Sequence, residues 1–128
     1  MLDTDTCIGV LRRREPVSER VRSHSPEDLA VSAMTVAELR FGALNSSDPE
    51  RTLEAVEALL SAPLEVVPFG DDAAWEHAEA RLVLRARPIG ERDLVIAATA
   101  LAGGFAIVTG NIRHFQRVPG LVVEDWTS

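Results

Sequence analysis

The chain has no lysine, a single cysteine and no apolar run of the roughly 20 residues that cross a bilayer. Without lysine, every active site that depends on a lysine side chain is excluded. The lone Cys7 forms neither a disulfide framework nor a cysteine zinc site, so we expect a cytoplasmic protein with no membrane partner. The chain reaches an acid already at Asp3, which does not fit a signal peptide.

Negative charge outweighs positive charge. The 20 acidic residues and 13 basic ones, all arginine, give a net charge of −7 at pH 7. Such an excess argues weakly against a nucleic-acid partner. Arginine forks nevertheless bind phosphates in a bidentate manner, so clustered arginines leave an RNA partner open.

Apolar periodicity predicts one α/β domain over residues 1–128, a length that suffices for a real core. Strands alternate with helices, which implies parallel pairing and an α/β sandwich. Trp75, Ala78 and Leu82 share one face of an expected helix. The expected strands are 29–32, 64–67, 105–109 and 121–123, and the expected helices are 4–11, 17–23, 35–45, one opening at Asp48-Pro49, 71–84 and 92–101.

Three acids, Asp3, Glu38 and Asp93, stand where short apolar runs meet helical patterns. We expect them at the carboxyl edge of the sheet, where ligands bind in open α/β folds. Two unit charges ~4 Å apart repel by about 4 kcal/mol at an effective dielectric of about 20. Convergent carboxylates therefore bind a cation or raise their pKa values. Oxygen ligands suit Mg²⁺ or Mn²⁺, ions that serve phosphodiester hydrolysis.

Each acid also has a purely structural explanation when taken alone. Thr35 and Glu38 fit a capping box, in which the glutamate reaches back to the cap residue. Asp93 suits the first turn of a helix, where the helix dipole favours an acid. Either Asp3 or Asp5 could cap the first helix, and for Asp5 we favour the cap. Capping does not explain why three acids share one edge.

Four short motifs occur in order along the chain and carry a family resemblance. They are Leu2-Asp3-Thr4-Asp5, Thr35-Val36-Ala37-Glu38-Leu39-Arg40-Phe41-Gly42, Asp93-Leu94-Val95-Ile96-Ala97-Ala98 and Thr109-Gly110-Asn111-Ile112-Arg113-His114-Phe115, followed by Pro119-Gly120 and Trp126. With these motifs the chain resembles the PIN-domain ribonucleases along nearly its whole length, and most closely the VapC toxins of bacterial toxin–antitoxin pairs. Any one motif is weak, but four at the right spacings make a strong match.

The resemblance implies a PIN-like three-layer sandwich, with a central, mainly parallel sheet of about four to five strands flanked by helices. It implies a toxin that cleaves RNA as a metal-dependent endoribonuclease with Mg²⁺ or Mn²⁺. By the same resemblance Asp3, Glu38 and Asp93 are the metal-binding catalytic acids, and Thr109 and Asn111 occupy a fourth corner. Asn111 is neutral where many relatives carry an acid, so this corner adds no charge.

The partners implied are an RNA substrate, a VapB-like antitoxin and a second copy of the chain. Arg40, Arg92 and Arg113 are candidates for contacts with RNA or antitoxin, as is Phe41. We expect the helices over residues 35–60 to help form the antitoxin groove. His114 is interpreted as a turn residue beside an inward-packing phenylalanine, and Trp75 and Trp126 as packing residues.

Two other enzyme or signalling classes fit poorly. Asp3-Thr4-Asp5-Thr6 partly matches the haloacid dehalogenase phosphatases, but the basic residue and late acidic pair of that class are missing. A phosphoreceiver domain needs a lysine. The alternative that Asn111 keeps open is a PIN-like domain that binds RNA or a partner without cleaving. Relatives have more apolar residues before the first acid than Met1 and Leu2, so either the central strand is short or the native start lies upstream.

Overall fold

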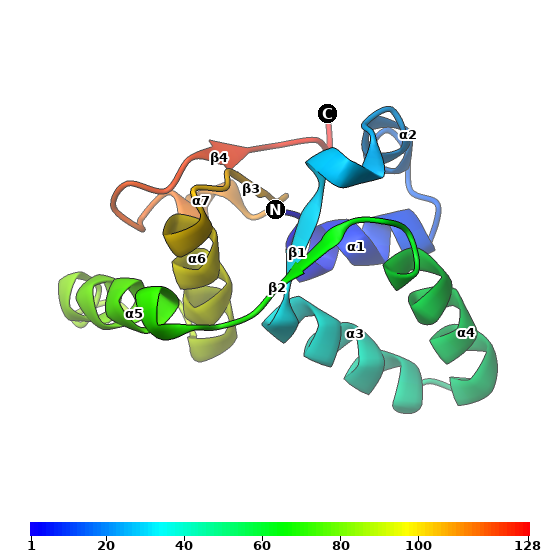
Figure 1. Ribbon diagram of the computed structural model, residues 1–128, viewed down its shortest axis with the longest axis horizontal. Coiled ribbons are helices and arrows are strands. Elements are labelled where there is room, and N and C mark those ends of the chain that lie inside the picture. The colour runs from blue at the N-terminus through cyan, green and yellow to red at the C-terminus, as the bar shows by residue number, and fades with distance from the viewer.

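The structure, a computed structural model, describes all residues from Met1 to Ser128 as helices alternating with short strands (Figure 1). No helix is both long enough and apolar enough to cross a membrane. The helices are α1 (Thr4–Leu11), α2 (Val17–Arg22), α3 (Ala33–Leu44), α4 (Pro49–Leu60), α5 (Asp71–Val83), α6 (Glu91–Gly103) and α7 (Ile112–Phe115), with a 3-10 turn at Pro26–Asp28. The strands are β1 (Ala30–Ser32), β2 (Glu65–Val67), β3 (Ile107–Val108) and β4 (Val123–Glu124).

Leu2 lies at the centre of the sheet. Strand β1 pairs in parallel with β2, and β3 with β4, while Leu2 bridges Val31 and Val108 in parallel. The backbone N–H of Leu2 donates to Ala30 O at 2.8 Å, and that of Asp3 donates to Val108 O at 3.0 Å. The parallel α/β arrangement is therefore confirmed, and the central strand is as short as the two residues before Asp3 suggest.

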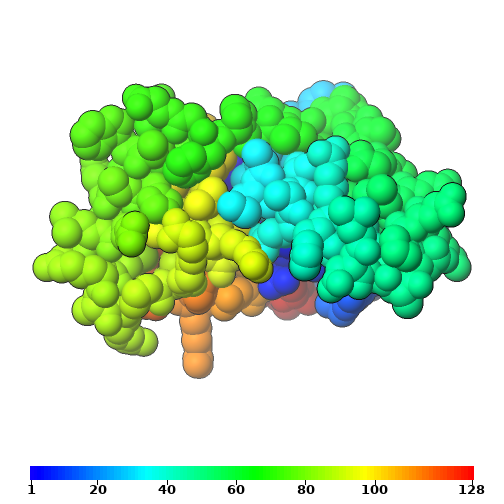
Figure 2. Space-filling view, turned by 90° about the horizontal axis from the view of Figure 1, so that it is seen from below, coloured from blue at the N-terminus to red at the C-terminus, as the bar shows by residue number.

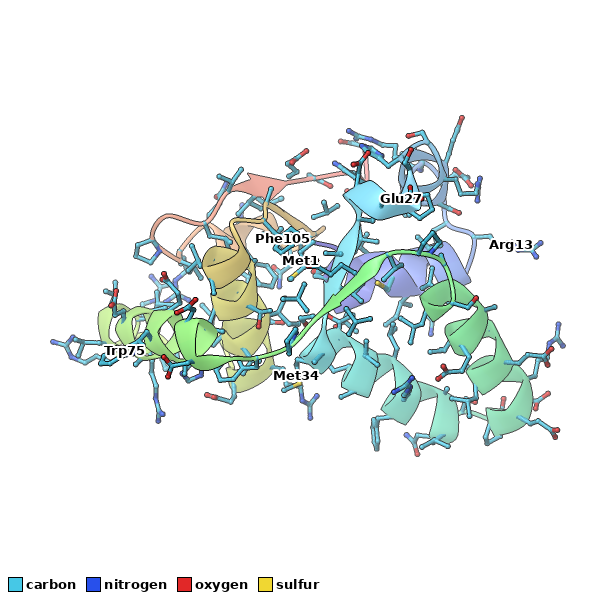
Figure 3. The ribbon with its side chains drawn as sticks, in the orientation of Figure 1. Met1, Arg13, Glu27, Met34, Trp75 and Phe105 are labelled. Carbon is cyan, nitrogen blue, oxygen red and sulfur yellow. The ribbon has the colours of Figure 1, made fainter.

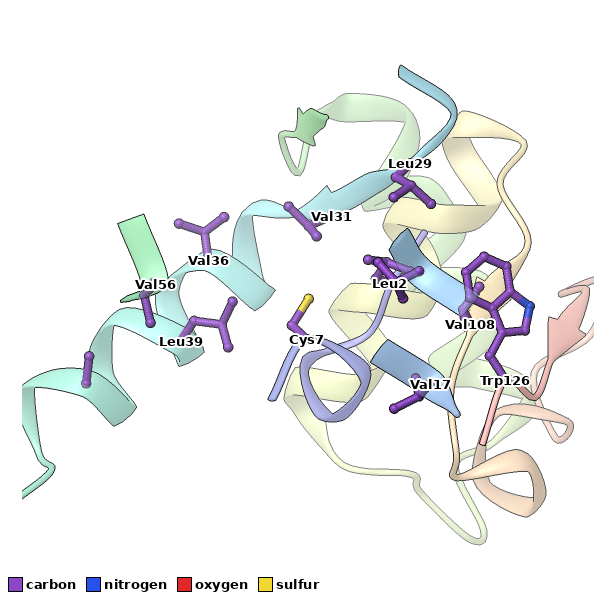
Figure 4. Packing of buried hydrophobic residues seen from close by; sticks show 12 residues of the cluster. Leu2, Cys7, Val17, Leu29, Val31, Val36, Leu39, Val56, Val108 and Trp126 are labelled. Atoms are coloured by element: carbon purple, nitrogen blue, oxygen red, sulfur yellow. The ribbon is translucent and has the colours of Figure 1, made fainter. Parts of the chain in front are cut away.

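Side chains alternate across the sheet and enter two cores, as the period of a strand requires. Leu2 and Val108 join Cys7 in the core beneath α1, α2, α3 and α4, shown in Figure 4. Their neighbours Met1 and Ile107 point to the opposite core, which α5, α6 and α7 supply. Helices thus cover both faces of the sheet, as the three-layer expectation requires.

Helix α3 begins two residues earlier than expected. The hydroxyl of Ser32 accepts a hydrogen bond from the backbone N–H of Thr35 at 3.0 Å, so Ser32 is the cap and Ala33 the first helical residue. The prediction of a capping box from Thr35 to Glu38 is therefore wrong. Glu38 lies in the second turn, where no backbone N–H needs it, and its carboxylate is available for another role.

The interpretation of Trp75 as a packing residue is wrong. Trp75 is 66% exposed and Leu82 61% exposed, and Trp75 lies on the outer side of α5 (Figure 3). The buried residues are the small Ala73 and Ala80, because α5 packs closely along α6. The prediction for Trp126 is confirmed, since this side chain is buried in the core beneath α1 to α4.

Candidate active site

Asp3 is a buried carboxylate at the end of the central segment. It caps α1, with Oδ1 accepting from the backbone N–H of Thr6 at 2.8 Å. Burial raises its pKa, and hydrogen bonds from Thr109 and Thr6 oppose that rise. The prediction that Asp5 is the cap is therefore wrong. Asp5 lies exposed in the first turn, and its charge raises the pKa of both Asp3 and Asp93, so it extends the acidic cluster.

Glu38 is directed toward α1 by a hydroxyl. Its Oε1 accepts a hydrogen bond from Thr4 Oγ1 at 2.7 Å, and its Oε2 lies 3.8 Å from the guanidinium of Arg92. The side chain is 22% exposed. Glu38 on α3 is thus linked to the first turns of both α1 and α6.

Asp93 stands in the first turn of α6. Gly90 precedes this helix with φ +94°, a conformation that glycine adopts without steric cost. Burial raises the pKa of Asp93, the His114 imidazole lowers it, and the charges of Glu38 and Asp5 raise it further. The expectation that each acid follows a strand fails for Asp93, which follows a loop after α5. Asp93 nevertheless lies close enough to Glu38 for that carboxylate to raise its pKa.

His114 faces Asp93, so its interpretation as a simple turn residue is wrong. Its Nε2 lies 2.9 Å from Asp93 Oδ2, yet this nitrogen is buried and has no hydrogen bond of acceptable direction. The neighbouring Phe115 packs inward as expected, at 1% exposure. Sequence reasoning missed the histidine because a four-residue helix offers no periodicity. Its place in the fourth motif was the available clue.

Thr109 and Asn111 are the residues predicted to lie beside the three acids. Only Thr109 is close to one of them. Thr109 is fully buried, and its hydroxyl lowers the pKa of Asp3. Asn111 is an exposed residue at the start of α7, and its backbone N–H donates to Thr109 Oγ1 at 2.9 Å. No hydrogen bond joins its side-chain amide to an acid. A role for Asn111 in the site therefore stays a prediction.

The four residues predicted to contact RNA or the antitoxin differ in how free their side chains are to bind a partner. Arg92 is 74% exposed beside Glu38, whereas Arg40 is held by Glu57 through two contacts of 2.8 and 3.2 Å between α3 and α4. Arg113 is exposed on α7, and Phe41 on α3 is 67% exposed. Only Arg92 approaches one of the predicted acids, and the contacts of all four stay predictions.

A groove of about 420 Å³ runs between α1, α3 and α4. Glu38 lies on its wall, so the groove is continuous with the acidic edge. Figure 2 views this side of the molecule, with the start of α1 (blue) visible between α3 (cyan) and α6 (yellow). The exposed Phe41 is not part of the lining. The apolar part of the lining is Ile8, Leu11, Leu39, Ala43, Ala55 and Val56.

Comparison with known proteins agrees with this arrangement. The family model described as PIN domain matches residues 1–121. The chain is 38% identical to the tRNA(fMet)-specific endonuclease VapC of Salmonella typhimurium, covering 98% of this chain and 96% of that protein. It is 36% identical to Ribonuclease VapC2 of Haemophilus influenzae, with the same coverage of 98% and 96%.

A solved structure extends the similarity to three dimensions. The structure of DNA-bound VapBC from Salmonella typhimurium superposes with a TM-score of 0.90 at 38% identity, covering 98% of this chain and 96% of that one. The sequence match, the fold and the order of the motifs agree. The chain belongs to the PIN-domain family, among the VapC ribonucleases that are the toxins of toxin–antitoxin pairs.

Proposed function

We propose that this VapC ribonuclease is an endonuclease in which Asp3, Glu38 and Asp93 hold a divalent cation, Mg²⁺ or Mn²⁺. The observation that carries the proposal is the environment of Asp93. Its pKa is raised by burial and also by the carboxylates of Glu38 and Asp5. Several carboxylates that share a half-buried edge favour a cation, which relieves their repulsion.

The donor atoms present are of the kind that binds such an ion. Carboxylate oxygens are the preferred ligands of Mg²⁺ and Mn²⁺. No three His, Cys, Asp or Glu side chains come close enough together in this arrangement to enclose an ion. The buried Nε2 of His114 has no hydrogen-bond partner, and a ligand at this edge would satisfy it.

When bound, such a cation supplies a Lewis acid for the phosphate and lowers the pKa of water. Hydrogen bonds within the protein hold the carboxylates in position. The backbone N–H of Thr6 fixes Asp3, and the hydroxyl of Thr4 fixes Glu38. The exposed guanidinium of Arg92 is placed to bind a phosphate of the RNA backbone in a bidentate manner.

We further propose transfer RNA as the substrate class, since the Salmonella relative is named for tRNA(fMet) and aligns over nearly the whole chain. The groove between α1, α3 and α4 would hold the antitoxin, with Glu38 offered to a basic side chain of it. One domain over residues 1–128, a homodimer and a cytoplasmic location complete the proposal. The exposed Trp75 and Leu82 on α5 are apolar surface that a second copy would bury.

The test is incubation of the purified chain with total RNA in Mg²⁺ or Mn²⁺, with and without a chelator. We expect discrete cleavage products, including products of transfer RNA, and their complete loss with the chelator. RNA binding without cleavage in either ion would support the binding-only alternative instead. Cleavage that persists in the chelator would contradict the role given to the acids.

A further inference from the structure

A cavity of about 310 Å³ lies where the end of α5 meets the start of α6. Its apolar lining comes from Leu84, Ile89 and Leu94. Two exposed arginines, Arg81 and Arg85, line it as well. The cavity therefore combines apolar side chains with cationic groups that solvent reaches, which suits a ligand that carries both a negative charge and an apolar part.

Neither arginine is neutralised within the chain. No acidic side chain forms an ion pair with Arg81 or Arg85, and the guanidinium of Arg85 donates to the backbone carbonyl of Leu82 at 2.7 Å. The one acid in the lining, Glu91, directs its carboxylate to His77 at 2.8 Å, and His77 is not part of the lining. In a chain with a net charge of −7, two unpaired arginines at one cavity favour an anion from outside the chain.

The cavity adjoins the acidic edge. Gly90 and Leu94 line it, and Asp93 stands in the same first turn of α6. A helix with its side chains is about 10 Å wide, so an RNA strand with one phosphate at Asp93 brings a neighbouring nucleotide to the cavity. Unpaired nucleotides of RNA loops expose both base and phosphate, and arginine binds phosphates through its fork and stacks on bases.

Resting on the proposed function, in which the acids cleave RNA, we propose that this cavity is a subsite for one unpaired nucleotide beside the cleaved bond. Arg81 and Arg85 bind its phosphate, and the base lies against Leu84 and Ile89. The subsite gives the polyanion two positive contacts next to a cluster of acids that repels it.

The subsite is tested by the fluorescence anisotropy of a labelled oligouridylate bound to the full chain in a chelator, over a range of salt concentrations. The chelator separates binding from cleavage. Each phosphate contact with single-stranded RNA contributes about 0.7 to the slope of log affinity against log salt. We expect Arg81→Gln and Arg85→Gln each to reduce the slope by about 0.7, and the double variant by about 1.4. At about 0.1 M salt each loss weakens binding about fivefold.

Arg13→Gln is the matched control. Arg13 is likewise exposed and without an ion pair, but it lies after α1, on the side of the molecule opposite to α5 (Figure 3). This variant should keep the wild-type slope. Arg85→Lys retains the positive charge and should also keep the slope, whereas a purely structural role for the contact with Leu82 would not depend on salt in this way.

An unchanged slope in the double variant would overturn the subsite. An equal loss in Arg13→Gln would do the same, because RNA would then bind diffusely to the basic surface. A double variant that binds RNA normally but loses affinity for the antitoxin would assign the cavity to that protein instead. RNA cleavage by the wild type, measured separately in Mn²⁺, tests the proposed function, so the failure of either claim is seen on its own.

Discussion

The hydroxyl of Thr4 donates a hydrogen bond to Oε1 of Glu38 at 2.7 Å. This bond joins the first turn of α1 to the second turn of α3, one residue after the capping acid Asp3. The first two sequence motifs thus meet through a threonine and a glutamate. The position of the Glu38 carboxylate depends on a residue that no metal-binding pattern would select.

Replacing Thr4 with valine removes this bond, together with a 3.2 Å hydrogen bond to Thr35 Oγ1, at nearly constant volume. A hydrogen bond to a charged group contributes about 1.5 kcal/mol or more, so we expect the cleavage rate to fall about tenfold. The melting temperature should change little. Thr52→Val is the matched control, because the Thr52 hydroxyl contacts only Ser46, at 3.0 Å, outside the acidic edge. Equal rates for Thr4→Val and Thr52→Val would show that the bond does not matter for catalysis.

Glu38→Gln and Ser32→Ala should separate catalysis from capping. We expect Glu38→Gln to abolish cleavage and leave the melting temperature nearly unchanged, because Ser32 is the cap of α3. Ser32→Ala should destabilise the protein by about 1 kcal/mol, the usual effect of losing a cap, and keep cleavage. Thermal unfolding and RNA cleavage measured on both variants check this. A large drop in melting temperature for Glu38→Gln would show that Glu38 stabilises the fold and would contradict its assignment to the active site.

Alkaline pH should destabilise the fold through one thiol. Burial raises the pKa of Cys7 to about 12, from an ordinary value of 9.0. Below pH 9 the thiol is neutral in both states. As pH rises from 9 toward 12 the unfolded chain alone loses the proton, so the free energy of unfolding falls by about 1.4 kcal/mol per pH unit.

The chain isolates this effect because it contains no tyrosine and no lysine. The amino group of Met1, with its pKa lowered by burial from 8.0, titrates below this range. Urea unfolding under reducing conditions from pH 9 to 11 measures the slope, and Cys7→Ala should flatten it. The same slope in Cys7→Ala would mean that the thiol is not the group responsible.

Phe41→Asp should weaken binding of the antitoxin. The side chain is 67% exposed on α3, a helix that also lines the groove, so an added charge there opposes apolar docking against this helix. We expect at least a tenfold loss of affinity by calorimetry. Val122→Asp, at a site 62% exposed beyond β3, is the control and should bind normally. If Phe41→Asp binds the antitoxin with unchanged affinity, the antitoxin binds at another surface.

The alternating elements and the acidic edge could be predicted because apolar periodicity and motif order are local properties. The cap of α3 could not, since Ser32 and Thr35 are equally able to cap, and only the hydrogen bond from the Thr35 backbone N–H to the Ser32 hydroxyl identifies Ser32 as the cap. The inward face of α5 could not be predicted either. Ala73 and Ala80 recur at the same spacing as Trp75 and Leu82, and close packing against α6 selects the small pair.

The candidate acids could be predicted because each lies in a sequence motif. A role that depends on contacts between segments distant in the sequence could not be predicted in this way. Thr4, the residue after Asp3, bonds to Glu38, and the Glu38 carboxylate raises the pKa of Asp93. The pairing of Asp93 with His114 depends on how α7 turns back after β3, which no local pattern encodes. The observed role of Asp3 as the cap of α1 is compatible with its proposed place in the site.

The most direct measurement is single-turnover cleavage of RNA in Mn²⁺ by the wild type, Asp93→Asn and Glu91→Gln. Glu91 lies two residues from Asp93 in the same helical turn and pairs with His77, away from the acids. We predict that Asp93→Asn slows cleavage by about a hundredfold or more, the usual effect of losing one charge-stabilising group, while Glu91→Gln cleaves normally. Cleavage by Asp93→Asn at the wild-type rate would contradict the assignment of the active site.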